Sequence, residues 1–394
     1  MAHGGEAVAR RDGKTYFVGG AIPGERVIGE VEHDRGAWAR VALRSIEVES
    51  AQRTEPPCPH FATCGGCQWQ FADHAAQLKW KRSIVAGQLA HLGGVADAVV
   101  RPVVSPGGAY GYRNRMDFRV AVGRPALFRA RSKDLVPLTR CLLLHPGLQD
   151  VFASLGPLDG AHRLTLRTGV RTGDLLVIIS GTVPEQAARW GASVVRAHRH
   201  RLEVVHGDRS ITEIVGGHRF RVTGTAFFQN NTEGAEALVT LAREAAGLTD
   251  DDVLLDAFAG SGLFAVNLGA SVDRVIAVEV SGTAVSDLRR NLTTAGLAHA
   301  RVLRGAFEQV AGIVDDYWTV AVVDPPRSGL GESGVAAVTA ARPRTIVYVS
   351  CDPASLARDA RHLAAAGYRL DWAAPVDMFP QTYHVETVAR FVAA

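Results

Sequence analysis

The sequence predicts an α/β protein in three parts: a small β-rich unit in residues 1–55, a mainly antiparallel region in residues 56–230, and a doubly wound domain in residues 231–394. Two patterns predict this division. Strand-like runs separated by turn residues dominate the first two parts, whereas helices alternate regularly with strands in the third. Regular alternation is typical of a mostly parallel sheet covered by helices. A chain of 394 residues is also longer than one ordinary core supports.

The first part contains three short runs rich in β-branched residues, at 15–18, 26–32 and 39–43, with glycine, proline and aspartate between them. Such runs between turn signals are typical of a small β-barrel or sheet. Pro56-Pro57 then ends the unit, because two consecutive prolines interrupt regular structure.

In the middle part we expect one long helix, from Asp73 to about Leu92, with Asp73 as its N-cap and apolar residues near helical spacing. The rest of this part is mostly β-structure. The expected strands lie at 115–122, 163–167, 175–180, 202–206 and 219–222.

The third part alternates helices with strands. The expected helices lie at 232–246, 262–268, 282–295, 307–314 and 353–365. The expected strands lie at 253–256, 274–279, 300–303, 319–324, 345–350, 369–377 and 386–392. In doubly wound sheets, ligands bind beyond the carboxyl ends of the strands. Asp256, Glu279, Asp324 and Cys351 each end or follow a strand, so we expect the functional site there.

Composition and charge leave a wide choice of partners. The formal net charge of +3 permits a polyanionic partner but does not require one. No apolar run approaches the roughly 20 residues of a membrane-spanning helix. The first residues lack the pattern of a secretory signal. We therefore expect a cytoplasmic protein without a membrane partner, a monomer by default, in which cysteines bind metal or do chemistry.

The five cysteines fall into two groups. Cys58, Cys64 and Cys67 lie close together and Cys141 follows far downstream, which suggests one set of metal ligands. Cys351 stands apart, directly after a predicted strand and two residues before Pro353. A thiol near a helix N-terminus has a lowered pKa and more thiolate, so we interpret Cys351 as a nucleophile.

A glycine-rich turn predicts a nucleotide site at the same edge of the sheet. It spans residues 256–262, and Glu279 ends the next strand, where a carboxylate can accept hydrogen bonds from ribose hydroxyls. The run from Gly260 to Ala265 also satisfies the dinucleotide pattern G-x-G-x-x-G/A. The motif alone therefore leaves a nicotinamide cofactor and S-adenosylmethionine as alternatives.

Two further motifs lie at the predicted reacting end. Asp324-Pro325-Pro326-Arg327 follows an apolar strand, and its prolines fix the backbone and remove two N–H donors where a substrate ring could lie. Glu386 begins the last predicted strand and could reach the same edge. A carboxylate near a thiol nucleophile suits a general base.

These motifs together resemble the RNA uracil-C5 methyltransferases. The resemblance covers nearly the whole chain and is carried by residues 58–70, 227–230, 256–262, 324–329, 350–353 and 384–387. Residues 58–70 resemble the iron–sulfur loop of the bacterial members, and the opening strands resemble a TRAM domain, an OB-like RNA-binding β-barrel. Leu263 departs from the pattern, since relatives often carry Asn there, and the TRAM-like start is short.

The resemblance implies a Rossmann-like class I methyltransferase domain that uses S-adenosylmethionine. It implies that Cys351 adds to C6 of a uracil, that C5 then accepts the methyl group, and that Glu386 removes the C5 proton. The base must leave its stack to react. The residues implied to hold S-adenosylmethionine are Gln229, Phe258, Glu279 and Asp324. The residues implied to bind one [4Fe–4S] cluster are Cys58, Cys64, Cys67 and Cys141, with structural zinc as the alternative.

The expected substrate is a uridine in RNA, with 23S ribosomal RNA favoured over the T-loop of transfer RNA because of the cysteine loop. Two other classes remain as rivals: a nicotinamide-dependent iron–sulfur oxidoreductase and a non-catalytic RNA-binding protein. The pairing of Cys351 with Glu386 argues against both, since neither class needs a nucleophile beside a base.

Overall fold

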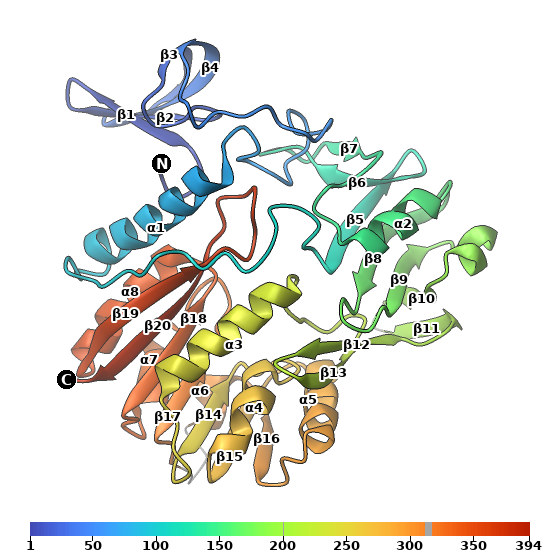
Figure 1. Cartoon of the computed structure of the whole chain (residues 1–394), viewed down its shortest axis with the longest axis vertical. Helices are drawn as coiled ribbons and strands as arrows, with labels where there is room; N and C mark the ends of the chain where they lie inside the picture. Colours follow the sequence, from blue (N-terminus) through green and yellow to red (C-terminus); the bar gives the residue numbers. More distant parts are fainter. Residues whose placement is uncertain (200, 312–316) are drawn as a thin grey trace.

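The computed structural model describes residues 1–199, 201–311 and 317–394. Within these residues the strands form a four-stranded sheet, a seven-stranded central sheet, a two-stranded hairpin and a second seven-stranded sheet. Figure 1 shows the N-terminal sheet at one end, the central sheet beside it and the C-terminal sheet at the other end. In the described part of the chain, no helix is long and apolar enough to span a membrane.

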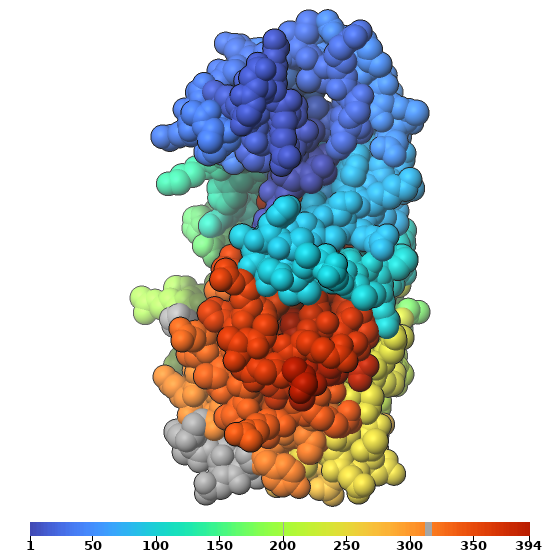
Figure 2. Space-filling view, turned by 90° about the vertical axis from the view of Figure 1, so that its left-hand side faces the viewer, coloured from blue at the N-terminus to red at the C-terminus, as the bar shows by residue number. Residues whose placement is uncertain are grey.

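The N-terminal sheet has the strand order β1-β2-β4-β3. Its strands are β1 (Ala7–Arg11), β2 (Lys14–Val18), β3 (Arg26–Asp34) and β4 (Trp38–Val48). The three predicted strands are present, and β1 was missed. The expected OB-like barrel is not confirmed, because β1 and β3 stand at opposite edges and no pairing among the described residues joins them. In Figure 2 this sheet forms the blue end of the molecule.

Helix α1 (His74–His91) connects this sheet to the rest of the molecule. The carboxylate of Asp73 accepts a hydrogen bond from the backbone N–H of Ala76 at 2.6 Å, so the predicted N-cap is confirmed. The helix packs against α8 of the C-terminal domain and buries Ile84, Val85 and Leu89.

The central sheet has the order β11-β10-β9-β8-β5-β6-β7, and all its neighbours are antiparallel except β9 and β10. Its strands are β5 (Arg115–Ala121), β6 (Arg124–Phe128), β7 (Leu135–Pro137), β8 (Ala161–Thr168), β9 (Leu175–Gly181), β10 (Ser193–His198) and β11 (Arg201–His206). Helix α2 (Pro146–Ser154) and the 3-10 helix η1 (Glu185–Arg189) contribute to the core on one face. The hairpin of β12 (Ser210–Val215) and β13 (His218–Thr223) leads to the C-terminal domain.

The C-terminal sheet has the order β16-β15-β14-β17-β18-β20-β19. Its strands are β14 (Val253–Ala257), β15 (Arg274–Glu279), β16 (Ala300–Arg304), β17 (Val320–Val323), β18 (Thr345–Ser350), β19 (Tyr368–Val376) and β20 (Glu386–Ala393). The first five strands in the order are parallel, and β20 runs antiparallel to both of its neighbours. The predicted doubly wound domain is therefore confirmed, with a reversed strand inside its edge.

Helices cover both faces of this sheet. They are α3 (Thr232–Ala246), α4 (Leu263–Leu268) with the 3-10 turn η2 (Gly269–Ser271), α5 (Gly282–Thr294), α6 (Phe307–Ala311), α7 (Gly331–Thr339) and α8 (Pro353–Ala365). Of the expected helix at 307–314, residues 312–314 lie outside the described residues.

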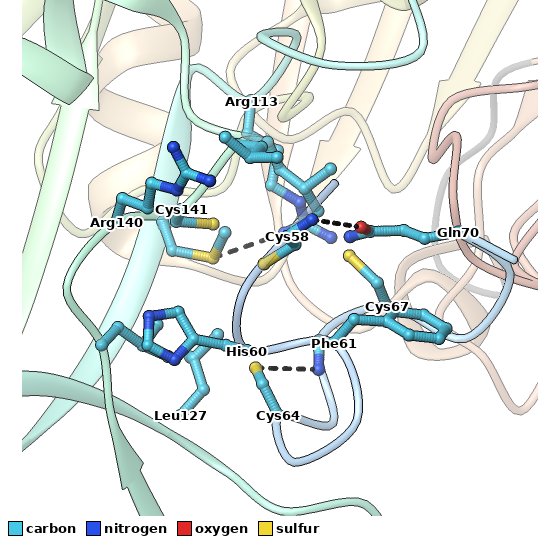
Figure 3. Close-up of a pocket in the computed structure, with 15 residues that line it drawn as sticks. Cys58, His60, Phe61, Cys64, Cys67, Gln70, Arg113, Leu127, Arg140 and Cys141 are labelled. Carbon is cyan, nitrogen blue, oxygen red and sulfur yellow. Dashed lines mark hydrogen bonds between the residues drawn. The ribbon is translucent and has the colours of Figure 1, made fainter. Parts of the chain in front are cut away.

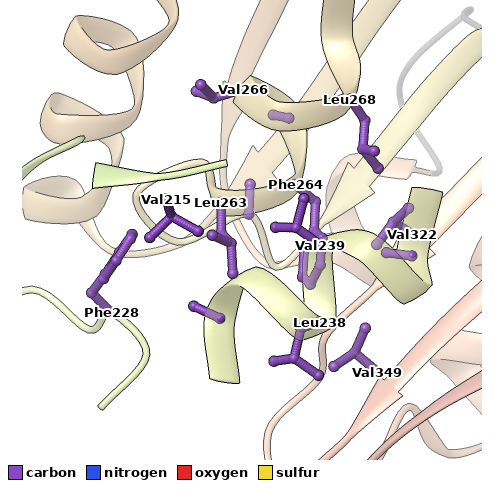
Figure 4. Close-up of a cluster of buried hydrophobic side chains, with 14 of the residues drawn as sticks. Val215, Phe228, Leu238, Val239, Leu263, Phe264, Val266, Leu268, Val322 and Val349 are labelled. Atoms are coloured by element: carbon purple, nitrogen blue, oxygen red, sulfur yellow. The ribbon is translucent and has the colours of Figure 1, made fainter. Parts of the chain in front are cut away.

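Neighbouring residues of strand β17 pack into different hydrophobic cores. Val322 of β17 packs with α3 and α4, whereas Val323 packs with α6, α7 and α8. Successive side chains of a strand point to opposite faces, so both faces are buried. Figure 4 shows the first core, in which Leu238 and Val239 of α3 lie near Phe264 and Val349. This packing fixes the strand ends that form the site.

Candidate active site

A cavity of about 610 Å³ lies at the carboxyl edge of the parallel strands. All six residues predicted for cofactor binding and catalysis line it: Gln229, Phe258, Glu279, Asp324, Cys351 and Glu386. Phe258, Glu279, Asp324 and Cys351 follow or end β14, β15, β17 and β18. Glu386 reaches the same edge because β20 is reversed, so its first residue lies where the parallel strands end.

The glycine-rich turn after β14 holds Glu279 from the backbone. The N–H of Gly260 donates to one carboxylate oxygen of Glu279 at 2.9 Å, and the N–H of Ser281 donates to the other at 2.6 Å. Gly262 has a φ of 95°, and a Cβ there would lie 2.7 Å from the side chain of Leu288. Glycine is therefore required at this position, both by conformation and by space.

Asp256 supports this turn from below. Its side chain is fully buried, does not line the cavity and accepts a hydrogen bond from the N–H of Ala265 at 2.7 Å. Burial, together with the nearby carboxylates of Asp324 and Glu279, raises the pKa of Asp256 to about 8. Asp256 thus positions the turn at the start of α4.

Gln229 and Asp324 meet across the cavity wall. The side-chain amide of Gln229 donates to the carboxylate of Asp324 at 3.4 Å, and burial raises the pKa of Asp324 to about 7. The central sheet holds this segment in place. Arg167, fully buried, donates to the carbonyl of Ala226 at 2.7 Å, and Asn114 donates to the carbonyl of Gln229 at 3.0 Å.

The thiol of Cys351 lies in a different electrostatic setting from the one expected. Burial, followed by the charges of Glu386 and Asp324, raises its pKa to about 12, and Arg327 alone among the main influences lowers it. The expectation of a lowered pKa from the helix N-terminus is therefore wrong for the free protein. Asp352, not Cys351, is the N-cap of α8 and accepts from the N–H of Ser355 at 2.8 Å. Cys351 lies outside the helix, and burial dominates.

Glu386 is buried, and burial together with the charge of Asp324 raises its pKa to about 8. The thiol and this carboxyl are therefore both protonated at neutral pH in the free protein. Glu386 already titrates close to working pH, as is typical of active sites, whereas Cys351 forms its thiolate only when a cation or substrate alters its surroundings.

Two polar residues that line the same cavity, Arg327 and His384, had no predicted role. The guanidinium of Arg327 lies 3.4 Å from Nδ1 of His384. Burial and the charge of Arg327 lower the pKa of His384 to about 4, so the imidazole is neutral and accepts from Arg327. A clue was present in the spacing, since His384 and Glu386 are two residues apart at the start of a strand.

The four remaining cysteines line a second, smaller cavity of about 170 Å³ (Figure 3). Cys58, Cys64 and Cys67 come from the loop before α1, and Cys141 comes from the loop before α2. All four are free thiols, and burial raises the pKa of Cys67 to about 12. Four thiols are the donor set of an iron–sulfur cluster or a structural zinc. Across residues 1–199, 201–311 and 317–394, however, no three His, Cys, Asp or Glu side chains are arranged to hold a metal ion.

Comparison with known proteins agrees with this geometry. The family model for tRNA (uracil-5-)-methyltransferases matches residues 193–391. An RNA methyltransferase of Gloeobacter violaceus is 34% identical over 99% of this chain and 94% of its own length. This chain belongs to the tRNA (uracil-5-)-methyltransferase family. A second family relative, from Halalkalibacterium halodurans, is 30% identical over 99% of this chain and 94% of its own length.

A solved structure has the same fold as this family member. The Pyrococcus abyssi tRNA (uracil-54, C5)-methyltransferase, in complex with S-adenosyl-L-homocysteine, gives a TM-score of 0.76 at 24% identity, over 97% of this chain and 96% of that one. The family match contains all six predicted cavity residues, whereas the four clustered cysteines lie outside it. Family membership favours an RNA methyltransferase over the two rival classes.

Proposed function

We propose that this protein transfers a methyl group from S-adenosylmethionine to C5 of a uridine in RNA. One observation carries the proposal: a single cavity combines a thiol, a buried carboxyl and a nucleotide-type turn at one edge of the sheet. Uracil C5 is a weak nucleophile, so its methylation needs a nucleophile for C6 and a base for the C5 proton. Cys351 is the cysteine that lines this cavity, and of its carboxyls Glu386 begins the strand paired with the one that Cys351 follows.

S-adenosylmethionine suits the other end of the cavity. Glu279, fixed by two backbone N–H groups, offers carboxylate oxygens to ribose hydroxyls. We propose that Phe258 packs on the adenine, and that Gln229 and Asp324 contact the amino acid part. When bound, S-adenosylmethionine supplies an electrophilic methyl group and a positive charge. Leu263 also lines the cavity and offers an apolar contact there.

In the proposed mechanism, the thiol of Cys351 and the carboxyl of Glu386, both protonated in the free protein, first lose their protons to water. The thiolate sulfur of Cys351 then bonds to C6, and the electron pair of the C5–C6 double bond moves to C5 and O4. C5 then bonds to the methyl carbon of S-adenosylmethionine, and the bond between that carbon and the sulfonium sulfur breaks. Glu386 takes the C5 proton, the C5–C6 double bond forms again, and the bond between Cys351 and C6 breaks. Arg327 favours the thiolate, because its charge lowers the pKa of Cys351.

Two RNA substrates remain candidates. We propose 23S ribosomal RNA, on the basis of the cysteine loop at residues 58–70. The T-loop of transfer RNA is the second candidate, favoured by the family's name and by the Pyrococcus abyssi structure of a tRNA uracil-54 enzyme. Mapping 5-methyluridine by mass spectrometry in a deletion strain decides between them, since only the true substrate loses the modification.

We further propose that Cys58, Cys64, Cys67 and Cys141 hold one [4Fe–4S] cluster, with structural zinc as the alternative. The chemistry of the donors supports this, because four cysteines from two loops line one cavity. The C-x₅-C spacing from Cys58 to Cys64 is unusual for zinc.

The reaction is tested with RNA carrying tritium at C5 of uridine. The protein is expected to release tritium only when S-adenosylmethionine is present. Methyl transfer into RNA without tritium release would contradict C5 as the acceptor, and absence of any methyl transfer to ribosomal or transfer RNA would contradict the proposal.

A further inference from the structure

A third hollow, of about 430 Å³, lies on the central sheet and includes none of the residues given a role above. We call it the arginine groove. Its side chains include Arg115, Asp117, Arg119, Phe128, Arg163 and Arg199. Four arginines face one aspartate, so the groove is basic although the whole chain has a formal net charge of only +3.

The groove adjoins both cavities already described. Thr225 lines the groove and the catalytic cavity, and Leu127 lines the groove and the cysteine cavity. Arg115, a groove residue, also donates to the carbonyl of Ala226 at 3.1 Å, and Ala226 lines the catalytic cavity. The groove therefore ends at the mouth of the proposed active site. Figure 1 shows β5, β6 and β8, which carry most of these residues, beside the C-terminal domain.

The sheet places two like charges opposite each other. Arg119 of β5 pairs in register with Arg163 of β8. Like charges directly opposite on neighbouring strands destabilise a sheet. Among the described residues, the side chain of Arg163 has no hydrogen-bond or ion-pair partner, and that of Arg119 has only the ring of Phe128, 5.8 Å from its guanidinium. Two neighbouring arginines that no carboxylate neutralises are typical of a site that binds an anion.

The one carboxylate of the groove is already engaged. Asp117 forms an ion pair with Arg115 at 3.2 Å and accepts a hydrogen bond from the hydroxyl of Thr165 at 2.6 Å. It therefore does not neutralise Arg119 or Arg163, which remain available to a ligand from solution.

Exposed aromatic rings lie at both ends of this basic surface. Phe128 is 44% exposed in the groove, and Phe227, which lines the catalytic cavity two residues after the shared Thr225, is 60% exposed. Large apolar side chains are usually withdrawn from water, but nucleic-acid bases stack on such rings. Arginines that follow the phosphates, with aromatic rings for the bases, are the usual surface for single-stranded nucleic acid.

We propose that the arginine groove binds the single-stranded RNA segment adjoining the target uridine. This inference rests on the proposed function, because the segment is placed by its continuity with the catalytic cavity. A uridine that enters that cavity has left its stack, so the nucleotides next to it are unpaired. Arg119 and Arg163 contact phosphates, and Phe128 stacks on a base. The bound phosphates offset the repulsion between the two arginines.

The test measures binding of a fluorescein-labelled oligouridylate of about a dozen nucleotides, by anisotropy over a range of salt concentrations. The double variant Arg119→Ala/Arg163→Ala is expected to weaken binding about tenfold or more and to reduce the slope of log K against log[salt] by about 1.4, or about 0.7 for each phosphate that an arginine no longer neutralises. Phe128→Ala is expected to weaken binding by at least about fivefold with an unchanged slope, because stacking releases no counterions.

Arg124→Ala is the matched control, since Arg124 is an exposed arginine of β6 in the same sheet but outside the groove. The control is expected to match the wild type in both affinity and slope. Thermal unfolding checks the fold: the double variant is expected to melt at the same temperature as the wild type or higher, because the like-charge pair is gone. A double variant that binds like Arg124→Ala overturns the inference.

Binding is measured without S-adenosylmethionine and without turnover, so it can be interpreted even if the wild type methylates no RNA. A wild type that methylates no RNA would contradict the proposed function and leave the groove's RNA binding intact. Conversely, wild-type tritium release with no loss of RNA binding in the double variant would overturn only the proposed RNA-binding role of the arginine groove.

Discussion

Ser350 of β18 is paired with Thr387 of β20, and this pair is the last in the register between the two strands. Towards this edge, Cys351 follows β18 and Glu386 is the first residue of β20, so the thiol and the carboxyl line the same cavity at one edge of the sheet. A purely parallel sheet could not produce this pairing, because each new strand would begin at the opposite edge. The reversed β20 thus brings a residue from a strand's beginning to the edge where β18 ends.

The first prediction separates the role of Cys351 as nucleophile from that of Glu386 as base. Cys351→Ala is expected to abolish both tritium release and any covalent adduct with 5-fluorouridine RNA, because no sulfur remains to bond to C6. Glu386→Gln is expected to slow tritium release about 100- to 10,000-fold, the usual contribution of a general base. It should also accumulate a protein–RNA adduct on denaturing gels, since the C5 proton is not removed.

Glu332→Gln serves as the control for this pair, because Glu332 is exposed in the first turn of α7 and outside the cavity. It is expected to behave as the wild type in both assays. Full activity of Cys351→Ala would end the covalent mechanism, and normal tritium release by Glu386→Gln would require another base.

The second prediction concerns stability and pH. The pKa of Glu386 is raised to about 8, above its ordinary value of 4.5. Between these values the unfolded chain loses this proton while the folded protein keeps it, so Glu386 reduces the free energy of unfolding as pH rises. Below about pH 4.5 both states are protonated and the effect vanishes.

Glu386→Gln is therefore expected to be more stable than the wild type near pH 8 and equally stable near pH 4.5. The difference should grow by about 1.4 kcal/mol for each pH unit within this window. Urea unfolding at several pH values measures it. Asp256 titrates in both proteins and cancels in the comparison, whereas the interaction of Asp324 with Glu386 is part of the measured difference. A constant difference across the window would show that the pKa of Glu386 is not raised.

The C-terminal domain was predictable because local sequence patterns indicate most of its helices and strands. Apolar strands of four to six residues alternate with capped helices, and the predicted strands of the parallel sheet agree closely with the structure. Helix α7 was missed because it begins at Gly331 without a side-chain cap. Short strands such as β7 were missed because three residues carry no periodic pattern. The barrel was not confirmed because closure depends on pairing between distant strands.

The site was predictable for a related reason. Five of its six candidate residues end, follow or begin strands, Gln229 being the exception, and the doubly wound topology brings those ends together without any knowledge of side-chain positions. What sequence could not supply was burial. The direction of the pKa shift of Cys351 depends on how deeply the cavity encloses it, and the contact between Arg327 and His384 joins residues 57 positions apart.

The third prediction concerns a buried ion pair beneath the site. Lys81 of α1 pairs with Asp377, both side chains are fully buried, and Lys81 also donates to the carbonyl of Phe379 at 3.0 Å. These two contacts of Lys81 join α1 to residues 377–379, in the segment that leads to Glu386. Lys81→Met is expected to lower the free energy of unfolding by about 3–5 kcal/mol, because it leaves the carboxylate of Asp377 buried without its cation.

Lys79→Met is the matched control, two residues away on the same helix and exposed. It is expected to change the free energy of unfolding by less than about 0.5 kcal/mol. Urea denaturation compares the two variants. Equal stability of both would mean that His74, which lies 2.8 Å from Asp377, is a sufficient partner for the carboxylate.

The last prediction concerns the clustered cysteines. Few interactions join their two loops: His60 contacts Thr139 at 2.9 Å, and Arg140 donates to the carbonyl of Pro57 at 3.3 Å. A shared cluster would therefore be a principal link between the loops, and its binding energy would stabilise the fold. Protein purified without oxygen is expected to contain iron and sulfide. Cys141→Ser should lose the iron and become more sensitive to proteolysis in residues 58–70.

Cys351→Ser provides the matched control, because Cys351 lies in the catalytic cavity and not in the cysteine cavity. It is expected to retain iron and protease resistance while losing methyl transfer. Stoichiometric zinc without sulfide would replace the cluster with the zinc alternative, and loss of iron in both variants would show that the iron is not held by these four thiols alone. Because each cavity has its own thiols, metal content and catalysis should be lost independently of each other.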